Sequence, residues 1–222
     1  MKQIVVEDVC FAYDDAAFAL EDISFKIQEK EGCILLVGKN GAGKSTLINL
    51  LCGCFKPAYG SVQRENLQIA YLPFDSPLYK HLTILENMRF YYRNFQGKNL
   101  DIDDPFVQEV IQALSIDYLL QRFDQCSSGQ QQKASIACIL LSGADLIIMD
   151  EPFVAIDTSS VARLIELISN MRKDTTFLVT THTITKLEPF ANRLLYLNES
   201  KLEMDTTNVQ EIQAYFKRDD SI

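Results

Sequence analysis

The sequence is poor in positive charge. Its 222 residues hold 21 Lys and Arg against 30 Asp and Glu, which gives a formal net charge of −9 at pH 7 and an isoelectric point near 4.8. A protein that binds nucleic acid along its surface needs a basic face, so this balance argues against nucleic acid as a partner. Lys39 and Lys44 form a local exception that suits one small anion.

Histidine and paired cysteine, the usual ligands of structural zinc, are scarce. The only histidines are His81 and His182, and none of the six cysteines belongs to a C-x-x-C pair. This argues against a zinc site. Because Cys33 and Cys138 lie in apolar runs, we interpret the cysteines as small buried hydrophobic residues of a reducing compartment.

Long apolar runs are also missing. Residues 1–7 contain no sustained apolar stretch of the kind that a signal peptide needs. No run approaches the roughly 18 apolar residues of a membrane-spanning helix. We therefore expect a cytoplasmic chain that does not itself span a membrane. Its length predicts one or two domains, and no repeat or low-complexity tract divides it.

One glycine-rich stretch organises what is present. Residues 38–46 fit the pattern G-x-x-x-x-G-K-[ST]. They follow an apolar run, 33–37, that predicts a buried strand, and they precede 47–51, which is typical of the first turns of a helix. Strand, loop and helix are the context that a phosphate-binding loop requires. A glycine-rich turn that carries a lysine by chance is the weaker interpretation.

The residue types in this stretch suit a triphosphate. Backbone N–H groups at a helix N-terminus are unsatisfied donors at the positive end of the helix dipole. Gly38, Gly41 and Gly43 let the loop curl closely around the phosphates. Lys44 is expected to reach the β- and γ-phosphates, and the Ser45 hydroxyl to bind Mg²⁺.

Two carboxylates follow a second apolar run. Asp150 and Glu151 come directly after 146–149, and a buried parallel strand delivers its carboxyl end to the ligand crevice. Asp150 can there hold the Mg²⁺ that Ser45 touches, and Glu151 can orient or deprotonate an attacking water. The alternative is a solvated acidic helix start with Pro152 as its first helical residue.

Hydrophobic periodicity predicts strands alternating with helices, and hence a mainly parallel sheet. The predicted strands cover 2–7, 22–27, 33–37, 68–72, 145–149 and 176–180, with a hairpin of 194–197 and 201–204. The predicted helices cover 45–53, 83 to 92 or 95, 106–114, 128–141, 159–173 and 209–217. A turn is predicted at 11–15 and a further short helix at 119–120. His182, after the strand at 176–180, is either a γ-phosphate contact or a structural histidine.

Taken together, these pieces resemble the nucleotide-binding domain of the ATP-binding-cassette (ABC) family over nearly the whole chain. Residues 38–46 match the family's phosphate loop, and 146–151 its Mg²⁺-binding strand with the adjoining catalytic glutamate. Residues 127–133, Ser-Ser-Gly-Gln-Gln-Gln-Lys, resemble its signature motif. Residues 155–157 match its D-loop, and His182 its switch histidine.

The resemblance implies an ATPase that uses ATP and Mg²⁺. The implied catalytic residues are Glu151 and His182, and the implied metal ligands are Ser45 and Asp150. The implied ATP-binding residues are Tyr13, which would stack on adenine, and the loop residues Gly38, Lys39, Asn40, Gly41, Ala42, Gly43, Lys44, Ser45 and Thr46.

In this family two domains close head to tail on two ATP molecules. The resemblance therefore implies that a second domain, identical or different, pairs with this chain. The residues that would act on the partner's ATP are Ser127, Ser128, Gly129 and Gln130, and Asp157 belongs to the implied D-loop. Hydrolysis would reopen the pair, and a helical insert would pass the motion to a membrane-spanning subunit.

The implied fold is α/β. It comprises a phosphate-loop NTPase core with a mainly parallel sheet, an N-terminal antiparallel β part and a helical insert at about 75–135, within a single domain, 1–222. The membrane-spanning subunit would be a separate polypeptide, with this chain peripheral on the inner face of the cell membrane. Residues 75–95 most resemble the cassettes of simple exporters.

Two positions depart from the family pattern. Ser128 stands where the signature has glycine, and Phe74 stands where a glutamine senses Mg²⁺ and water. Asp75 would replace that glutamine if the loop shifts by one residue. These departures leave two alternatives open. One is a weakly hydrolytic cassette that pairs with a different one, and the other is a soluble ABC-type ATPase of an assembly pathway, such as iron–sulfur cluster building.

Overall fold

The computed structural model describes residues 2–14, 17–180 and 188–219. Their strands are β1 (Gln3–Ala12), β2 (Phe18–Gln28), β3 (Cys33–Val37), β4 (Tyr59–Glu65), β5 (Ile69–Leu72), β6 (Leu146–Asp150), β7 (Thr176–Thr180), β8 (Arg193–Asn198) and β9 (Lys201–Thr206). Their α-helices are α1 (Lys44–Cys52), α2 (Ile84–Gln96), α3 (Pro105–Ala113), α4 (Ser128–Leu140), α5 (Thr158–Met171) and α6 (Val209–Asp219). Within these described ranges, no helix combines the length and apolar composition needed to cross a bilayer.

A six-stranded sheet forms the centre of the molecule, in the order β5-β6-β7-β3-β8-β9. The first five of these strands run parallel, and β9 returns antiparallel to β8 as the predicted hairpin. Every residue of β3, β6 and β7 is buried. Successive side chains of a strand point to opposite faces, so these strands need apolar cover on both sides.

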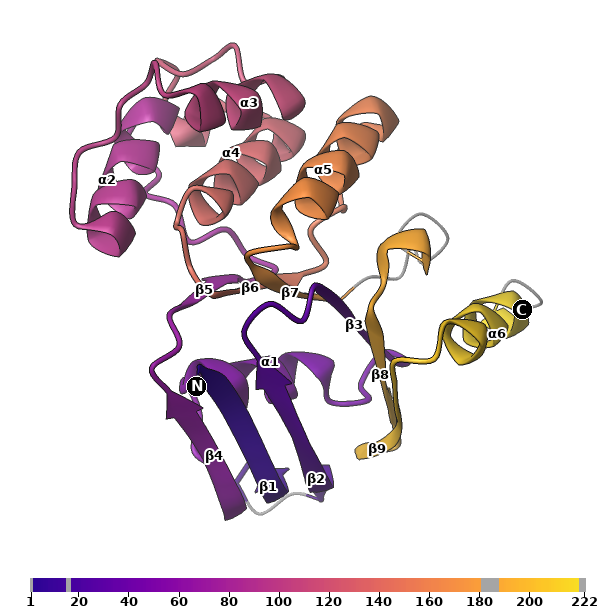
Figure 1. The fold of residues 1–222 in the computed structure, drawn as a ribbon. Coiled ribbons are helices and arrows are strands. Elements are labelled where there is room, and N and C mark those ends of the chain that lie inside the picture. The colour runs from indigo at the N-terminus through magenta and orange to yellow at the C-terminus, as the bar shows by residue number, and fades with distance from the viewer. Residues whose placement is uncertain (1, 15–16, 181–187, 220–222) are drawn as a thin grey trace.

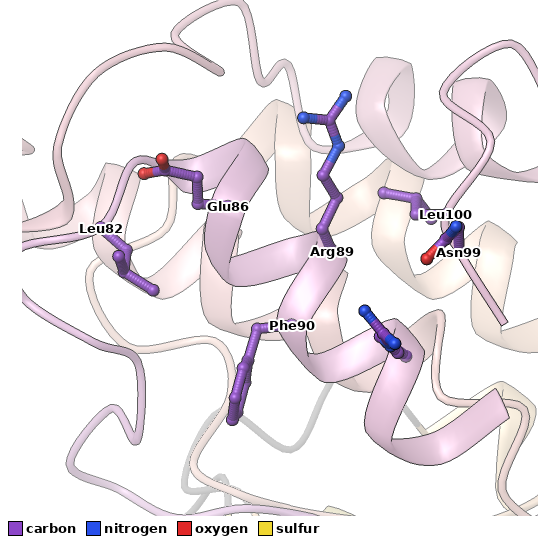
Figure 2. Close-up of a pocket in the computed structure, with 7 residues that line it drawn as sticks. Leu82, Glu86, Arg89, Phe90, Asn99 and Leu100 are labelled. Atoms are coloured by element: carbon purple, nitrogen blue, oxygen red, sulfur yellow. The ribbon is translucent and has the colours of Figure 1, made fainter. Parts of the chain in front are cut away.

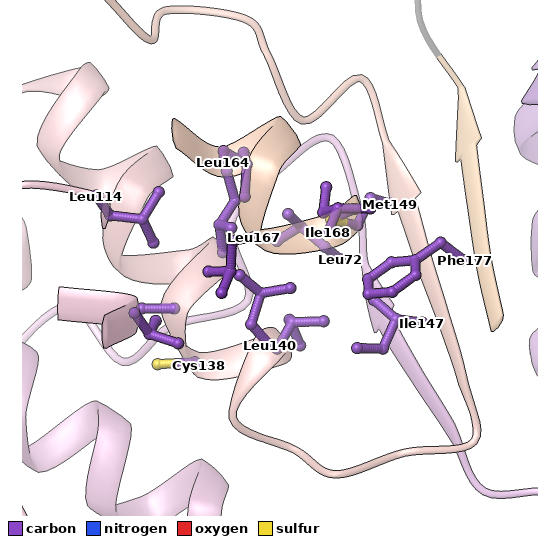
Figure 3. Close-up of a cluster of buried hydrophobic side chains, with 14 of the residues drawn as sticks. Leu72, Leu114, Cys138, Leu140, Ile147, Met149, Leu164, Leu167, Ile168 and Phe177 are labelled. Carbon is purple, nitrogen blue, oxygen red and sulfur yellow. The ribbon is translucent and has the colours of Figure 1, made fainter. Parts of the chain in front are cut away.

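One face of this sheet packs against the helices that follow β5 and β6. Leu140 of α4 and Leu164, Leu167 and Ile168 of α5 lie against Ile147 and Phe177 of the sheet (Figure 3). The apolar residues of α5 recur at helical spacing, which is why one side of that helix is buried. The sequence pattern at 159–173 is thus confirmed as an amphipathic helix.

The opposite face of the sheet is covered by α1 and by a three-stranded antiparallel sheet, β2-β1-β4. Helices α2 to α5 gather on one side of β5, β6 and β7, whereas α1, β1, β2 and β4 lie on the other (Figure 1). Alternate side chains of β3 therefore enter the two different cores. Cys33, Leu35 and Val37 join the helical core, and Ile34 and Leu36 join the core around α1.

The helices α2, α3 and α4 lie between β5 and β6 in the chain. Helix α2 begins at the predicted capping box, in which Glu86 N donates to Thr83 Oγ1 and Thr83 N donates to Glu86 Oε2. The short helix predicted at 119–120 is wrong. The Leu119 carbonyl instead accepts from Leu85 N at the start of α2, which holds this segment in a turn.

One prediction for the antiparallel part needs correction, and one strand there was not predicted. The turn at 11–15 starts too early, because β1 continues to Ala12 by pairing with Phe18 of β2; Asp15 lies outside the described residues. Strand β4 was not predicted at all. It is an edge strand of largely exposed polar residues, so it shows no apolar alternation, and only its pairing with β1 makes it a strand.

The two-sided core leads to a stability prediction. Leu164→Ala removes a side chain of α5 with an exposed fraction of 0% and should lower the free energy of unfolding by about 2–5 kcal/mol. Leu120→Ala makes the same chemical change at a residue that is 80% exposed and should cost about 0.5 kcal/mol or less. Urea unfolding followed by far-UV circular dichroism measures both. Equal losses would contradict the assignment of Leu164 to the core.

Candidate phosphate-binding site

The loop between β3 and α1 can be built only with glycine at two positions. Gly38 has a φ of +152°, and a Cβ there would lie 2.2 Å from the carbonyl oxygen of Leu197. Gly43, the N-cap of α1, has a φ of +102°, and a Cβ would lie 2.6 Å from the carbonyl oxygen of Ala19. The loop is therefore pressed against neighbouring backbone, and its tight curl exposes the N-terminus of α1 to a ligand.

Lys44, the first residue of α1, is held against the loop that it follows. Its Nζ donates hydrogen bonds to the carbonyl oxygens of Gly38 (2.7 Å) and Lys39 (3.2 Å). Burial lowers the pKa of the Lys44 ammonium, and the carboxylates of Glu151 and Asp150 oppose that shift. A cation thus sits at the centre of the loop with two carboxylates close enough to influence its charge.

Asp150, at the carboxyl end of β6, is fixed by two hydroxyl groups. Ser45 Oγ donates to its Oδ2 (2.9 Å), and Thr180 Oγ1 at the end of β7 donates to its Oδ1 (2.6 Å). Thr180 Oγ1 in turn accepts from the backbone N–H of Glu151 (2.9 Å). This chain of hydrogen bonds joins α1, β6 and β7, orients the Asp150 carboxylate and holds the backbone of Glu151 beside it.

These groups surround a cavity of about 310 Å³. Its lining residues are Asn40, Gly41, Gly43, Lys44, Ser45, Thr46, Phe74, Asp150 and Glu151. The donor set suits Mg²⁺, which prefers oxygen ligands and is usually held by one or two protein groups together with substrate phosphates. The Ser45 hydroxyl and the Asp150 carboxylate, in mutual contact at the cavity wall, are such groups, and the N-terminus of α1 with Lys44 suits the phosphates.

The structure brings Phe74, and not Asp75, to this cavity. The Phe74 ring is 61% exposed beside the charged residues. The segment that carries it is fastened to α4, because Ser76 Oγ and Ser135 Oγ share a hydrogen bond of 2.6 Å. The register shift that would have let Asp75 replace the family's glutamine therefore does not occur.

Tyr13 approaches the site from the antiparallel sheet. Its hydroxyl is 2.9 Å from Thr46 Oγ1 on α1. Its ring meets those of Phe11 and Phe55 edge to face, with centroids 5.0 and 5.8 Å away. Tyr13 does not line the cavity itself. It is fixed next to it as an exposed aromatic surface of the kind on which a base can stack.

The signature-like residues lie at the N-terminus of α4. Ser127 caps this helix, with Gln130 N donating to Ser127 Oγ (3.3 Å) and Ser127 N donating to Gln130 Oε1 (2.9 Å). A Cβ on Gly129 would lie 2.6 Å from the carbonyl oxygen of Ala155. None of residues 127–130 lines the cavity at Lys44, and Ser127 and Ser128 are exposed.

Two further contacts join α4 to the segment that follows Glu151. Gln132 Nε2 donates to the carbonyl oxygen of Pro152 (3.2 Å), and Lys133 forms an ion pair with Asp157. Asp157 also caps α5 by accepting from Ser160 N. The hydrogen bond from Lys133 holds the pKa of the Asp157 carboxyl well below its ordinary value. The start of α4 and the D-loop region therefore form one connected unit.

Some of the predicted site residues do not line the cavity, and one residue that contacts Asp150 was not predicted. Gly38, Lys39 and Ala42 belong to the loop but do not line the cavity. His182 lies outside the described residues. Thr180 was missed by the sequence analysis. The only signal was a hydroxyl residue ending the strand predicted at 176–180, and its bond to Asp150 depends on β7 lying beside β6.

A glycine-rich loop on a helix N-terminus, with a buried lysine and two carboxylates at the carboxyl end of another parallel strand of the same sheet, defines the nucleotide site of a phosphate-loop ATPase. The family model described as "ABC transporter" matches residues 20–154. The chain therefore belongs to the ABC transporter family, and it is an ATPase that binds ATP with Mg²⁺.

Individual relatives agree with this assignment. The chain is 32% identical over 217 residues to the ergothioneine transport ATP-binding protein EgtV of Helicobacter pylori, covering 90% of this chain and all of that protein. A solved ATP-binding subunit of an ABC transporter has a TM-score of 0.83 at 24% identity, covering 97% of this chain and 94% of that one. A dimeric ATP-binding cassette bound to ADP and Pi has a TM-score of 0.77 at 23% identity, covering 92% and 98%. These likenesses confirm the predicted α/β fold.

Thr180 offers a test of the hydrogen-bond chain at Asp150. Thr180→Val keeps the side-chain shape but leaves Asp150 Oδ1 and Glu151 N without this hydroxyl, which should cost about 1–3 kcal/mol of stability and weaken Mg²⁺-dependent ATP binding. Thr176→Val is the matched control, because Thr176 Oγ1 bonds Gln28 O and Glu31 N at the other end of β7. Urea unfolding and titration calorimetry would compare them. If both variants weaken ATP binding equally, the Thr180 bond has no special role at the site.

Phe74 offers a test of hydrolysis. Phe74→Gln should raise steady-state ATP turnover severalfold, because a hydrogen-bonding side chain would replace an apolar ring beside the carboxylates. ATP affinity should change little, since the phosphate loop is untouched. Phe106→Gln on α3, another exposed phenylalanine, is the control and should leave turnover unchanged. Unchanged turnover in Phe74→Gln would mean that the ring does not limit the reaction.

Proposed function

We propose that this chain is the ATP-hydrolysing subunit of an exporter, bound at the cytoplasmic face of the cell membrane to a separate membrane-spanning subunit. Support comes from relatives that are named as ATP-binding proteins of transporters, for import as well as for export. The direction rests on the likeness of residues 75–95 to exporter cassettes. We further propose one domain, 1–222, in which about 75–135 form a helical subdomain that transmits motion.

One observation supports pairing with a second cassette. Residues 127–130 present the N-terminus of α4 away from the cavity at Lys44, with Ser127 and Ser128 exposed. A helix N-terminus is a good anion site, and this one lies outside its own chain's phosphate cavity. A head-to-tail partner would supply the missing phosphate, so that Ser127, Ser128, Gly129 and Gln130 act on the partner's ATP.

Within each site, we propose the following division of work. Lys44 and the loop N–H groups hold the phosphates, and Ser45 and Asp150 hold Mg²⁺, which when bound neutralises phosphate charge. Glu151 orients or deprotonates the attacking water, and Tyr13 stacks on the adenine. His182 contacts the γ-phosphate, and Asp157 positions the segment between the two sites.

A second candidate function is favoured by Phe74 and Ser128. An apolar ring at the cavity and a side chain in the signature suit a weakly hydrolytic cassette that pairs with a different, more active one. The two candidates differ in whether this chain pairs with itself.

The mass of the Glu151→Gln variant in solution distinguishes the candidates. Removing the proposed base should trap the closed pair on ATP without preventing binding. Light scattering with MgATP is then expected to give twice the 25.2 kDa of the chain, and without nucleotide the single mass. ATP-bound monomers would contradict self-pairing and favour the heteromeric candidate.

A double variant provides the control for this measurement. Adding Lys44→Ala to Glu151→Gln removes the phosphate contact and should leave the protein monomeric at the same ATP concentration. If the double variant dimerises as readily, the pairing does not depend on nucleotide and the proposed mechanism fails.

A further inference from the structure

Two cysteines lie at the end of α1 that is farther from the phosphate loop. Cys52 is the last residue of the helix, Cys54 follows one residue later, and both are free thiols. By contrast, the cavity of about 590 Å³ beside α2, with Arg89 and Phe90 on its wall (Figure 2), is lined by no thiol, hydroxyl or imidazole group. The reactive groups considered below are therefore the two thiols at the end of α1.

The backbone turns sharply between these cysteines. Gly53, the C-cap of α1, has a φ of +79°, a left-handed conformation that suits glycine. Gly53 N donates to the Leu50 carbonyl oxygen (3.1 Å) and Cys54 N to the Asn49 carbonyl oxygen (2.9 Å), which is the Schellman pattern of a helix end. Residues two apart are separated by about 7 Å at most between their Cα atoms. The turn shortens that separation toward the range of about 4.4–6.8 Å that disulfides span.

The two thiols differ in exposure, which sets the order in which they react. Cys54 is exposed, whereas Cys52 packs against the apolar core around α1. Burial and the neighbouring Cys54 raise the pKa of the Cys52 thiol to about 12, against the opposing effect of the Arg64 guanidinium. Arg64 Nε donates to the Leu51 carbonyl oxygen (2.7 Å) at the end of the helix, and a Cβ on Gly53 would lie 3.4 Å from Arg64 Cζ. Cys54 therefore meets an external reagent first, and the nearby cation favours the thiolate of Cys52 in a second step.

The same turn positions an aromatic ring next to Tyr13. Phe55 N donates to the Asn49 carbonyl oxygen (3.3 Å), which also accepts from Cys54 N. The Phe55 ring stacks on Phe11 with centroids 5.2 Å apart and meets the Tyr13 ring edge to face at 5.8 Å. A change in the backbone of the turn is therefore passed to a ring that supports Tyr13.

We propose that Cys52 and Cys54 form a reversible disulfide when the chain meets a low-molecular-weight disulfide, and that this bond displaces Phe55 and weakens ATP binding through Tyr13. Disulfides in reducing compartments are usually transient and redox-sensing, and exposed ones are the labile ones. The modification site goes beyond the proposed function. Its effect on affinity rests on the proposed contact of Tyr13 with adenine.

The reaction is two successive thiol–disulfide exchanges. The Cys54 thiolate attacks one sulfur of the small disulfide, whose S–S bond breaks, and the first small thiol leaves with the proton that Cys54 gave up. The Cys52 thiolate then attacks Cys54 Sγ in the mixed disulfide, and the second small thiol leaves with the proton from Cys52. Two protein thiols are oxidised, and one small disulfide is reduced to two thiols.

Peptide mass tests whether the bond forms. The purified full chain is equilibrated with oxidised and reduced glutathione, its remaining thiols are alkylated, and trypsin then leaves both cysteines in the peptide 45–64, which has no other cysteine. That peptide should carry neither the alkyl label nor glutathione, should be two hydrogen atoms lighter than its dithiol form, and should return to that form on reduction. A mixed disulfide that persists at Cys54, pairing of Cys54 with Cys10, or no reaction in excess oxidised glutathione would each overturn the proposal.

Titration calorimetry tests the effect on the nucleotide. Oxidation should weaken ATP binding about two- to tenfold, the size of one aromatic contact, and should leave the binding of inorganic triphosphate unchanged because the phosphate loop is untouched. Cys54→Ser prevents the disulfide and should abolish the response. Cys10→Ser on β1 is the matched control and should keep it. Equal ATP affinities of the oxidised and reduced chain, or an equal response in Cys54→Ser, would overturn the effect on binding.

Tyr13→Ala separates this inference from the proposed function. If Tyr13→Ala weakens ATP binding, oxidation of that variant should add little, because Phe55 acts through the ring that has been removed; a full further loss would overturn the route through Tyr13. If Tyr13→Ala leaves ATP binding unchanged, the adenine contact of the proposed function fails and the effect on affinity fails with it. The peptide mass then upholds or overturns the disulfide on its own.

Discussion

Burial of the parallel sheet on both of its faces is the constraint on which the phosphate-binding site depends. With β3, β6 and β7 enclosed on both sides, a one-residue slip would exchange the side chains of the two cores. The observed register places Asp150 directly opposite Thr180 and Leu36 beside the same threonine on the other neighbouring strand. That register allows the hydrogen bond from the Thr180 hydroxyl to Asp150. Asp150 in turn accepts from Ser45 and so holds the start of α1 in place. Core packing therefore sets the geometry of a polar site that contributes little to the core itself.

The net negative charge of the chain repels anions at long range, whereas the phosphate loop offers positive groups that act at contact. A net charge of −9 opposes the approach of a polyphosphate at long range. Salt screens that repulsion beyond about 8–10 Å, so binding depends on donors that act at contact. The loop provides them through Lys44 and the N-terminus of α1.

Local sequence patterns predicted the strands in which every residue is buried, and the motifs that residue type and spacing define. The strand at 33–37 is a continuous apolar run, the strand at 176–180 has three apolar residues between two threonines, and both were predicted to the residue. The loop, α1 and Asp150 followed from residue type and spacing. Strand β4 and the turn at 119–120 could not be predicted this way, because backbone partners distant in sequence define them. The contact of Thr180 with Asp150 likewise depends on β7 lying beside β6.

The hydrogen bonds of Lys44 have a thermodynamic consequence. Its ammonium group already donates two of its three N–H groups to the carbonyl oxygens of Gly38 and Lys39, so a phosphate adds one bond through the third and gains others only by exchanging these two. These hydrogen bonds within the loop hold its curled conformation before any nucleotide binds. For each bond that is exchanged, only the difference between donation to an anionic phosphate oxygen and donation to a neutral carbonyl oxygen contributes to affinity. The enthalpy of nucleotide binding is accordingly smaller than a count of phosphate contacts would imply, and the ordering entropy of the loop is largely met during folding.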